Sequence, residues 1–220
     1  MVEKSYHHGD LKNALIQAGI KILAEDGLKG FSLRKVAREA GVTHSAPYAH
    51  FTDKQALIAA ISTDGYQKVF NRFVLIKETY PNDVLRQFIE IAWAYVSFGF
   101  EEPDHFKITF SASVEREREY PDLVEMTGKT FNELKQLVIR CQEAGLIDEG
   151  DADLMALTVW SQVHGFVNLI HENMISHTVT DLYTLRSMMI LSLNHILRHP
   201  LTEDPADQTA LGKKQSKVTT

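Results

Sequence analysis

The chain has 220 residues, 44% of them hydrophobic, enough for one large domain or for a small and a medium one around a continuous core. A single cysteine, Cys141, excludes an internal disulfide framework and a cysteine-based metal cluster, and it favours a reducing compartment. Neither a secretory signal nor a long uninterrupted apolar segment is present, so the sequence predicts a soluble cytoplasmic protein without a membrane partner.

The net charge of −6 is unevenly distributed along the chain. Residues 1–55 carry eight Lys and Arg against six Asp and Glu, a formal charge of +2, and the remainder carries −8. A locally basic surface can bind phosphate while a distant acidic body keeps the protein soluble. The asymmetry is therefore compatible with a nucleic-acid partner for the first part of the chain.

Apolar residues recur throughout at spacings of three and four, and alternation with period two is almost absent. This pattern predicts an all-α protein of about nine helices, the first three small and the last two long. The first helix is expected to begin at Asp10 and to end near Asp26-Gly27, and Ser32 is expected to cap the second. Gly41 then provides a left-handed stop, and Thr43 is expected to cap a very short third helix.

Longer helices are expected in the rest of the chain. They span about residues 53–76, 88–100, 121–145, 151–173 and 181–198, with a short segment near residues 106–110. The helix over residues 88–100 is the most apolar of them and is expected to be buried on nearly all sides. The polar tail over residues 201–220 is expected to be disordered.

Residues 32–51 contain the parts of a helix-turn-helix. Ala37 is small enough for a close helix crossing, Gly41 permits the turn, and Thr43 caps a second helix whose outer face would enter the major groove. Arg34 is equally consistent with a solvated charge. For Tyr48, packing is the alternative to a DNA contact, and the contact is favoured. The residues expected to contact DNA are Ser32, Arg34, Thr43, His44, Ser45, Pro47, Tyr48, His50 and Lys54.

This part of the sequence resembles the TetR (tetracycline-repressor-like) family of transcriptional regulators. The resemblance rests on Gly27, Phe31-Ser-Leu-Arg-Lys-Val-Ala-Arg-Glu-Ala-Gly-Val-Thr43, Tyr48-Ala-His-Phe51 and Lys54. The resemblance implies a DNA-binding domain over residues 8–65 and a ligand-binding and dimerisation domain over residues 66–199. It also implies that Thr43, His44, Ser45 and Pro47 face bases, and that Tyr48, His50 and Lys54 hold phosphates. Ala49 departs from the pattern, because many relatives carry a larger polar or basic residue there.

A second, shorter motif lies in the C-terminal half. Trp160-Ser-Gln-Val-His164-Gly165 resembles the Trp-His-Gly signature of one subgroup of TetR-like C-terminal domains. The last two predicted helices are apolar on more than one face, so one face can cover the core and another a second copy of the chain. We therefore expect a homodimer formed through these two helices.

Aromatic residues in the C-terminal half are candidates for an apolar effector pocket, with His164 as a polar anchor. For any single aromatic residue, plain core packing is the simpler interpretation, and His164 is equally plausible as a core histidine bonded to a backbone carbonyl. The candidate pocket residues are Phe70, Phe73, Trp93, Tyr95, Phe98, Phe110, Phe131, Trp160 and His164.

No catalytic arrangement is recognisable, so the sequence favours a regulator over an enzyme. His195 and His199 are one helical turn apart, but no carboxylate or thiol joins them at ligand spacing, and neither a metal nor a cofactor is expected. The resulting hypothesis is a homodimeric repressor that a small apolar effector releases from a palindromic operator. An activator of the same fold, and a helical ligand-binding protein or enzyme that does not bind DNA, are the alternatives.

Overall fold

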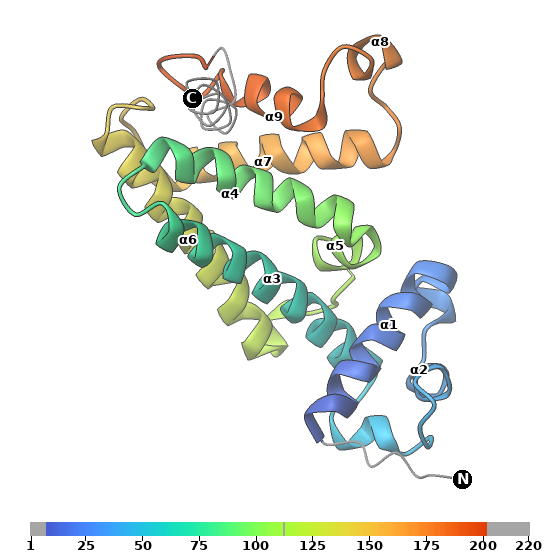
Figure 1. Cartoon of the computed structure of the whole chain (residues 1–220). Helices are drawn as coiled ribbons and strands as arrows, with labels where there is room; N and C mark the ends of the chain where they lie inside the picture. The colour runs from blue at the N-terminus through green and yellow to red at the C-terminus, as the bar shows by residue number, and fades with distance from the viewer. Residues whose placement is uncertain (1–7, 112, 202–220) are drawn as a thin grey trace, which may run out of the picture. The chain divides into compact units, whose positions relative to one another are not determined.

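The computed structural model describes residues 8–111 and 113–201, and these residues form helices joined by turns (Figure 1). This confirms the all-α prediction. The predicted disorder of the C-terminal tail concerns residues outside the described part, apart from Leu201. The elements are α1 (His8–Gly30), α2 (Leu33–Glu39), η1 (Ala46–Ala49), α3 (Lys54–Thr79), α4 (Val84–Glu101), α5 (Pro103–Thr109), η2 (Glu117–Glu119), α6 (Pro121–Glu143), α7 (Ala152–His171), α8 (His177–Thr180) and α9 (Leu185–Leu193).

The chain folds into two compact units, each made of two stretches of sequence. Among the described residues, the head unit comprises those up to Phe70 together with Phe98–Thr130, and the body unit comprises Asn71–Ser97 together with those from Phe131 onward. The domain boundary expected near residue 65 falls inside α3, which continues without a break to Thr79. Among the described residues, no helix is both long and apolar enough to cross a membrane.

The core of the head unit is formed by one face each of α1, α2 and α3. Leu15 and Ile22 of α1, Val36 of α2 and Leu57 of α3 are almost completely buried in one cluster, to which α5 adds Ile108. Burying each such side chain stabilises the fold by about 1.5–3 kcal/mol relative to leaving it in water. The segment around α5 therefore belongs to the head unit, although it begins at Pro103, 24 residues after α3 ends at Thr79.

A close helix crossing holds α5 against α3. A Cβ added to Gly65 would lie 1.9 Å from Oγ1 of Thr109, so glycine is required at this point of contact. One helical turn away, Nε2–H of the buried His105 donates a hydrogen bond to the Ile61 carbonyl at 2.9 Å. Packing and a buried hydrogen bond thus fix the same pair of helices.

The predicted helix ends of the head unit are only partly confirmed. Oγ of Ser32 accepts a hydrogen bond from the Lys35 amide at 3.3 Å, and Gly41 adopts the left-handed conformation with φ 69°. Gly27 also has a positive φ of 63°, and with a non-helical ψ of −173° it divides the span His8–Gly30 at a kink, so the first helix ends at Gly27, as predicted.

The expected third helix is a 3₁₀ turn, η1, which begins later than Thr43. Pro47 lies in its first turn and has no amide hydrogen to donate, and the Ser45 side chain makes no capping hydrogen bond. A short helix is present, but the expectation that Thr43 caps it is wrong, since Ser45 stands at its N-cap position.

In the body unit, α7 begins as expected and the last helix does not. Oδ1 of Asp151 accepts hydrogen bonds from the amides of Asp153 and Leu154 at 2.9 and 3.1 Å and so caps α7. The helix expected over residues 181–198 is instead the shorter α9, because Thr184 starts the helix by accepting a hydrogen bond from the Ser187 amide at 3.1 Å; α8 lies before the predicted span. The expectation of two long final helices is therefore wrong for the last one.

Cys141 of α6 is completely buried in the body unit. Burial raises the pKa of its thiol to about 12, against a smaller opposing effect of the Arg140 charge. The side chain therefore remains a neutral thiol at physiological pH and acts as a small apolar core residue.

Candidate nucleic-acid interface

The helix-turn-helix segment presents α2 and η1 on either side of the Gly41 turn (Figure 1). Leu33, Val36 and Ala37 on one face of α2 are buried, and Arg34 on the other face is exposed. The turn is closed by the Val42 amide, which donates to the Ala37 carbonyl at 2.9 Å. The segment therefore has the core-facing and solvent-facing sides that a DNA-binding motif requires.

Two ion pairs hold α2 against α1 at the surface of the head unit. Lys35 pairs with Asp26, and Lys21 pairs with Glu39. The hydrogen bond and charge of Glu39 raise the pKa of Lys21, which stays protonated. Arg34 has no such side-chain partner among the described residues, so its guanidinium is available to an external anion.

The three residues between the turn and η1 are exposed. Thr43 and Ser45 have their hydroxyl oxygens 3.2 Å apart, a hydrogen bond in which either can be the donor, and His44 lies between them. Tyr48 follows in η1 with 63% of its surface exposed, which disfavours a packing role. Hydroxyl, imidazole and phenol groups are therefore exposed along residues 43–48, the polar edge of the motif, where they can meet base edges or phosphates.

Lys54 is exposed at the beginning of α3, beside a capped helix end. Oδ1 of Asp53 accepts a hydrogen bond from the Ala56 amide at 2.9 Å, and this fixes the start of the helix. The geometry suits a phosphate contact from Lys54, which the resemblance implies and which stays a prediction. Ser32 is also exposed, with its hydroxyl oxygen already engaged in capping α2.

Two of the expected DNA contacts lie differently. Pro47 is buried, so the prediction that it faces outward is wrong; its ring packs inward from the first turn of η1. His50 is half-buried, with its ring centroid 6.2 Å from that of Phe51. Its phosphate role therefore stays a prediction made for a side chain that is only partly accessible.

Comparison with protein families matches both halves of the chain. Residues 15–61 match the model described as bacterial regulatory proteins of the tetR family, and residues 88–193 match the Tetracyclin repressor-like C-terminal domain. Together the two matches cover more than half of the chain. The chain belongs to the TetR family of transcriptional regulators. The predicted Trp-His-Gly subgroup stays a prediction.

Individual relatives and solved structures share 30% or less of their aligned residues with this chain. The chain is 30% identical over 63 residues to the uncharacterized HTH-type transcriptional regulator YuxN of Bacillus subtilis (strain 168), a stretch that covers 29% of the chain and 22% of YuxN. A protein of unknown function from Rhodococcus sp. RHA1 is 29% identical, with a TM-score of 0.68 over 85% of this chain and 93% of that one. FadR from Bacillus subtilis in complex with stearoyl-CoA shares the fold, with 16% identity and a TM-score of 0.68 over 84% and 97%.

In the body unit of this TetR-family protein, four of the candidate pocket residues meet. The Trp160 ring centroid lies 6.5 Å from that of Phe131 and 6.2 Å from that of His164. Nε1–H of Trp160 donates to the Tyr95 hydroxyl at 3.1 Å, and that hydroxyl lies 2.8 Å from Nδ1 of His164. Partial burial lowers the pKa of His164, so the neutral ring accepts the Tyr95 proton at Nδ1 and carries its own hydrogen on Nε2.

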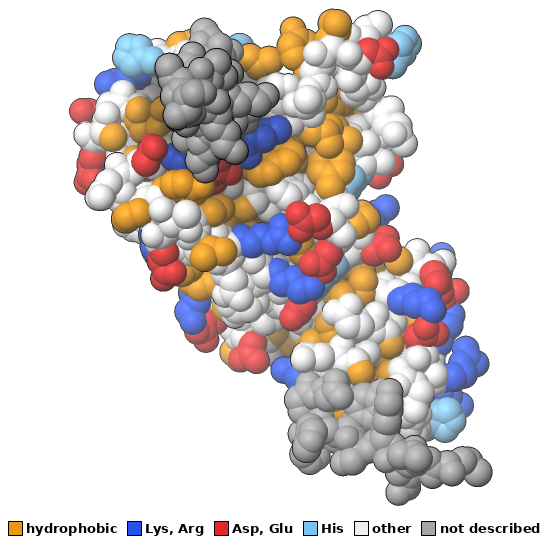
Figure 2. All heavy atoms as spheres, viewed as in Figure 1, with side chains coloured by type: hydrophobic (Ala, Val, Ile, Leu, Met, Phe, Trp, Pro, Cys, Tyr) orange, Lys and Arg blue, Asp and Glu red, His pale blue; other side chains and the backbone are white. Residues whose placement is uncertain are grey.

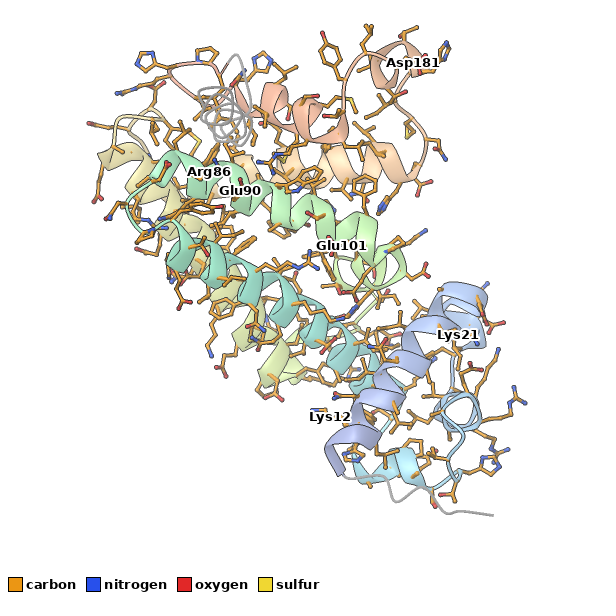
Figure 3. All side chains as sticks on the ribbon, in the orientation of Figure 1. Lys12, Lys21, Arg86, Glu90, Glu101 and Asp181 are labelled. Carbon is orange, nitrogen blue, oxygen red and sulfur yellow. The ribbon has the colours of Figure 1, made fainter. Side chains whose placement is uncertain are left out.

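Trp93 belongs to a separate charged cluster of the body unit. The Arg186 guanidinium lies 5.4 Å from the Trp93 ring centroid and bonds both Glu90 carboxylate oxygens, at 3.0 and 3.2 Å. Nε of Arg86 also donates to Glu90, at 2.9 Å (Figure 3). The sequence analysis did not predict this cluster. The spacing of four residues between Arg86 and Glu90 indicates an ion pair on one helix face, but no local sequence feature connects this pair to Arg186.

The other candidate pocket residues are packing residues within their own unit. Phe73 is buried in the body unit, and Phe70 is half-buried in the head unit. Also in the head unit, Phe98 and Phe110 contact the buried Phe106 with ring centroids 6.0 and 4.8 Å away. The structure therefore brings Tyr95, Phe131, Trp160 and His164 together and assigns Phe70, Phe98 and Phe110 to the head unit.

Proposed function

We propose that this TetR-family protein is a homodimeric repressor that leaves a palindromic operator when a small, largely apolar effector binds its body unit. The observation that carries the proposal is the exposed polar edge of Thr43, His44, Ser45 and Tyr48 next to a capped and ion-paired α2. Exposed donors on a rigid turn are suited to reading DNA, because they need no rearrangement to reach a groove. Such a protein would act in the cytoplasm.

The proposed dimer surface lies on the last helices of the body unit. Of the twelve large hydrophobic residues exposed in the described part, eight lie between Leu154 and Leu191, on or between α7, α8 and α9. Figure 2 shows hydrophobic side chains at the surface in this region. An apolar surface of this kind commonly marks a protein interface, and a twofold contact uses the same patch on both copies.

The Tyr95, Trp160 and His164 cluster supports an effector site in the body unit. Aromatic walls with one neutral histidine suit a largely apolar ligand. The fold that the chain shares with FadR in complex with stearoyl-CoA makes a long acyl chain the first effector to try.

The decisive experiment measures fluorescence anisotropy of labelled DNA from the region upstream of the protein's own gene, against random duplex of equal length. We expect a preference for one upstream fragment and a steep loss of affinity with salt. The double variant Thr43→Ala/His44→Ala should lose the preference, while Lys29→Ala, an exposed change elsewhere on α1, should keep it. Equal binding of all duplexes at low salt would overturn the proposal and favour a protein that does not regulate through DNA.

Effector binding can be followed separately, since both tryptophans, Trp93 and Trp160, lie in the body unit. In Trp93→Phe, the remaining Trp160 reports on its own surroundings, and we expect stearoyl-CoA to change its emission and to release DNA. An increase in reporter expression after gene deletion indicates a repressor, and a decrease indicates an activator.

A further inference from the structure

A cavity of about 390 Å³ lies within the head unit, and its lining includes none of Thr43, His44, Ser45 and Tyr48 and none of the aromatic cluster of the body unit. Its walls are the first two turns of α1, the segment that follows η1, one face of α3, and the junction of η2 with α6. Its volume falls within the range of about 300–1,000 Å³ that is usual for small-molecule sites.

The floor of the cavity is apolar. Ile16 of α1, Phe51, and Leu123 of α6 are buried there. Ala56, Ala59 and Ala60 line the α3 side, at helical spacings that place them on one face. Three small side chains on that face leave the space that larger ones would fill.

The rim of the cavity carries one positive and two negative side chains. Lys12, near the start of α1, is exposed (Figure 3), and Asp122, in the first turn of α6, is exposed on another wall. Neither forms an ion pair with any other described residue. The third charged group, Asp64, is already 3.6 Å from Nζ of Lys68. The rim therefore offers a cation and an anion that are both available to a ligand.

Neutral polar side chains also line the walls of the cavity. The hydroxyl of Thr63 donates to the Ala59 carbonyl at 2.8 Å and is turned to its own helix. Burial, followed by the charge of Asp53, raises the pKa of Tyr120, so its phenol keeps its hydrogen and can donate. A ligand here would meet an apolar floor and an edge that recognises opposite charges.

We propose that the head cavity binds a small zwitterion with an apolar body, such as an amino acid with a hydrophobic side chain. Its carboxylate pairs with Lys12, its ammonium group pairs with Asp122, and its side chain occupies the floor beside Ala59 and Ala60. The aromatic cluster of the body unit is not involved, so this site is additional to the proposed effector site.

Occupation of the cavity would also act on DNA binding, a consequence that rests on the proposed function. His50 and Phe51 line the cavity and directly follow η1, so a bound molecule would fix the end of the DNA-facing segment. Ordering this segment in advance would change the affinity for DNA through the difference in ligand binding between the free and DNA-bound states.

The proposal is tested by isothermal titration of the full-length protein with L-phenylalanine and L-leucine up to about 10 mM, a concentration that detects millimolar affinity. We expect saturable binding at one site per chain for at least one of them. Phenethylamine lacks the carboxylate and 3-phenylpropionate lacks the ammonium group, and each should bind at least about 10-fold more weakly than L-phenylalanine. Equal affinity for phenethylamine or 3-phenylpropionate, or no binding of either amino acid, would overturn the proposal.

Variants locate the site. Lys12→Ala and Asp122→Ala should each weaken binding about 10-fold, while Lys29→Ala and Asp104→Ala, exposed charges outside the cavity, should leave it unchanged. Ala60→Leu should abolish binding by filling the floor, with exposed Ala144→Leu as its size-matched control. If Ala60→Leu does not fold, the charge variants still decide, because unchanged binding in both would place the ligand elsewhere. DNA anisotropy is measured independently, so failure here is distinguishable from failure of the repressor proposal.

Discussion

The head and body units use polar side chains in opposite ways. In the head unit the candidate DNA-binding groups, such as His44 and Tyr48, are exposed on a turn whose shape is fixed by local caps and surface ion pairs. In the body unit, Glu90 and Tyr95 are withdrawn from solvent and join helices that are distant in sequence. Surface groups can be changed without much loss of stability, whereas the inner groups contribute both to stability and to any ligand site.

The largest change in stability should come from Gly65 in the head unit, which is buried and contributes to packing, unlike the exposed DNA-facing groups of that unit. Gly65→Ala places a methyl group 1.9 Å from Oγ1 of Thr109, which should lower the free energy of unfolding by about 3 kcal/mol. Urea denaturation measures this change in the free energy of unfolding. Gly128→Ala is the matched control, because nothing lies within 4 Å of the new methyl group on this helix, and it should stabilise by about 0.5–1 kcal/mol. Equal effects would mean that α5 is not held closely against α3.

The second-largest loss of stability is expected on removing a buried charge in the body unit. Glu90→Gln removes the shared charge that Arg86 and Arg186 contact, and it should destabilise the fold by about 2 kcal/mol, since all three side chains are at least four-fifths buried. Glu125→Gln removes an exposed carboxylate paired with Lys129 and should cost about 0.5 kcal/mol or less. Thermal unfolding of both variants compares them; a similar loss in each would remove the distinction between inner and surface charges.

A third test separates two kinds of surface group within the head unit. His44→Ala should change the preference between operator sequences by about 1 kcal/mol, because a base contact distinguishes sequences. Lys54→Ala should instead weaken binding to all sequences alike and reduce the slope of log affinity against log salt by about 1. Anisotropy titrations at several salt concentrations measure both, with exposed Lys107→Ala as the control. A uniform loss from His44→Ala would contradict its assignment as a base reader.

The smallest effect concerns pH. Burial lowers the pKa of His164 below its ordinary value of 6.5, so the unfolded chain binds a proton more readily than the folded one. This residue's contribution is complete above pH 6.5 and is lost as the pH falls below it. His164→Gln should therefore flatten the fall in stability between pH 7.5 and pH 5.5, while His44→Gln, at an exposed site, should leave it unchanged. Parallel curves for the wild type and His164→Gln would contradict the assignment.

Local signals in the sequence predicted the local features of the head unit. The cap at Ser32 and the left-handed Gly41 depend only on neighbouring residues, and both are confirmed. The 3₁₀ form of η1 and the burial of Pro47 were missed, because the tertiary packing of a few residues outweighed the capping signal of Thr43. The start of the last helix at Thr184 was missed because Asp181, slightly earlier in the sequence, is by residue type an equally suitable N-cap.

Contacts between distant residues were beyond sequence reasoning. Tyr95 and His164 are 69 residues apart, and Glu90 and Arg186 are 96 apart. The candidate aromatic residues were chosen by type, and the structure distributes them between the two units because side-chain packing depends on the course of the whole chain. The cavity of the head unit was missed for the same reason, although the three alanines on one face of α3 indicated small side chains there.

Cys141 makes the folded chain a natural background for site-directed labelling. It is the sole cysteine, it is buried in the body unit, and its thiol is protonated. The native protein should therefore not react with maleimides until it is unfolded. A single introduced thiol, such as Thr43→Cys, would then carry a spin label alone. In a dimer, the distance between two such labels would follow the separation of the DNA-facing edges as ligands are added.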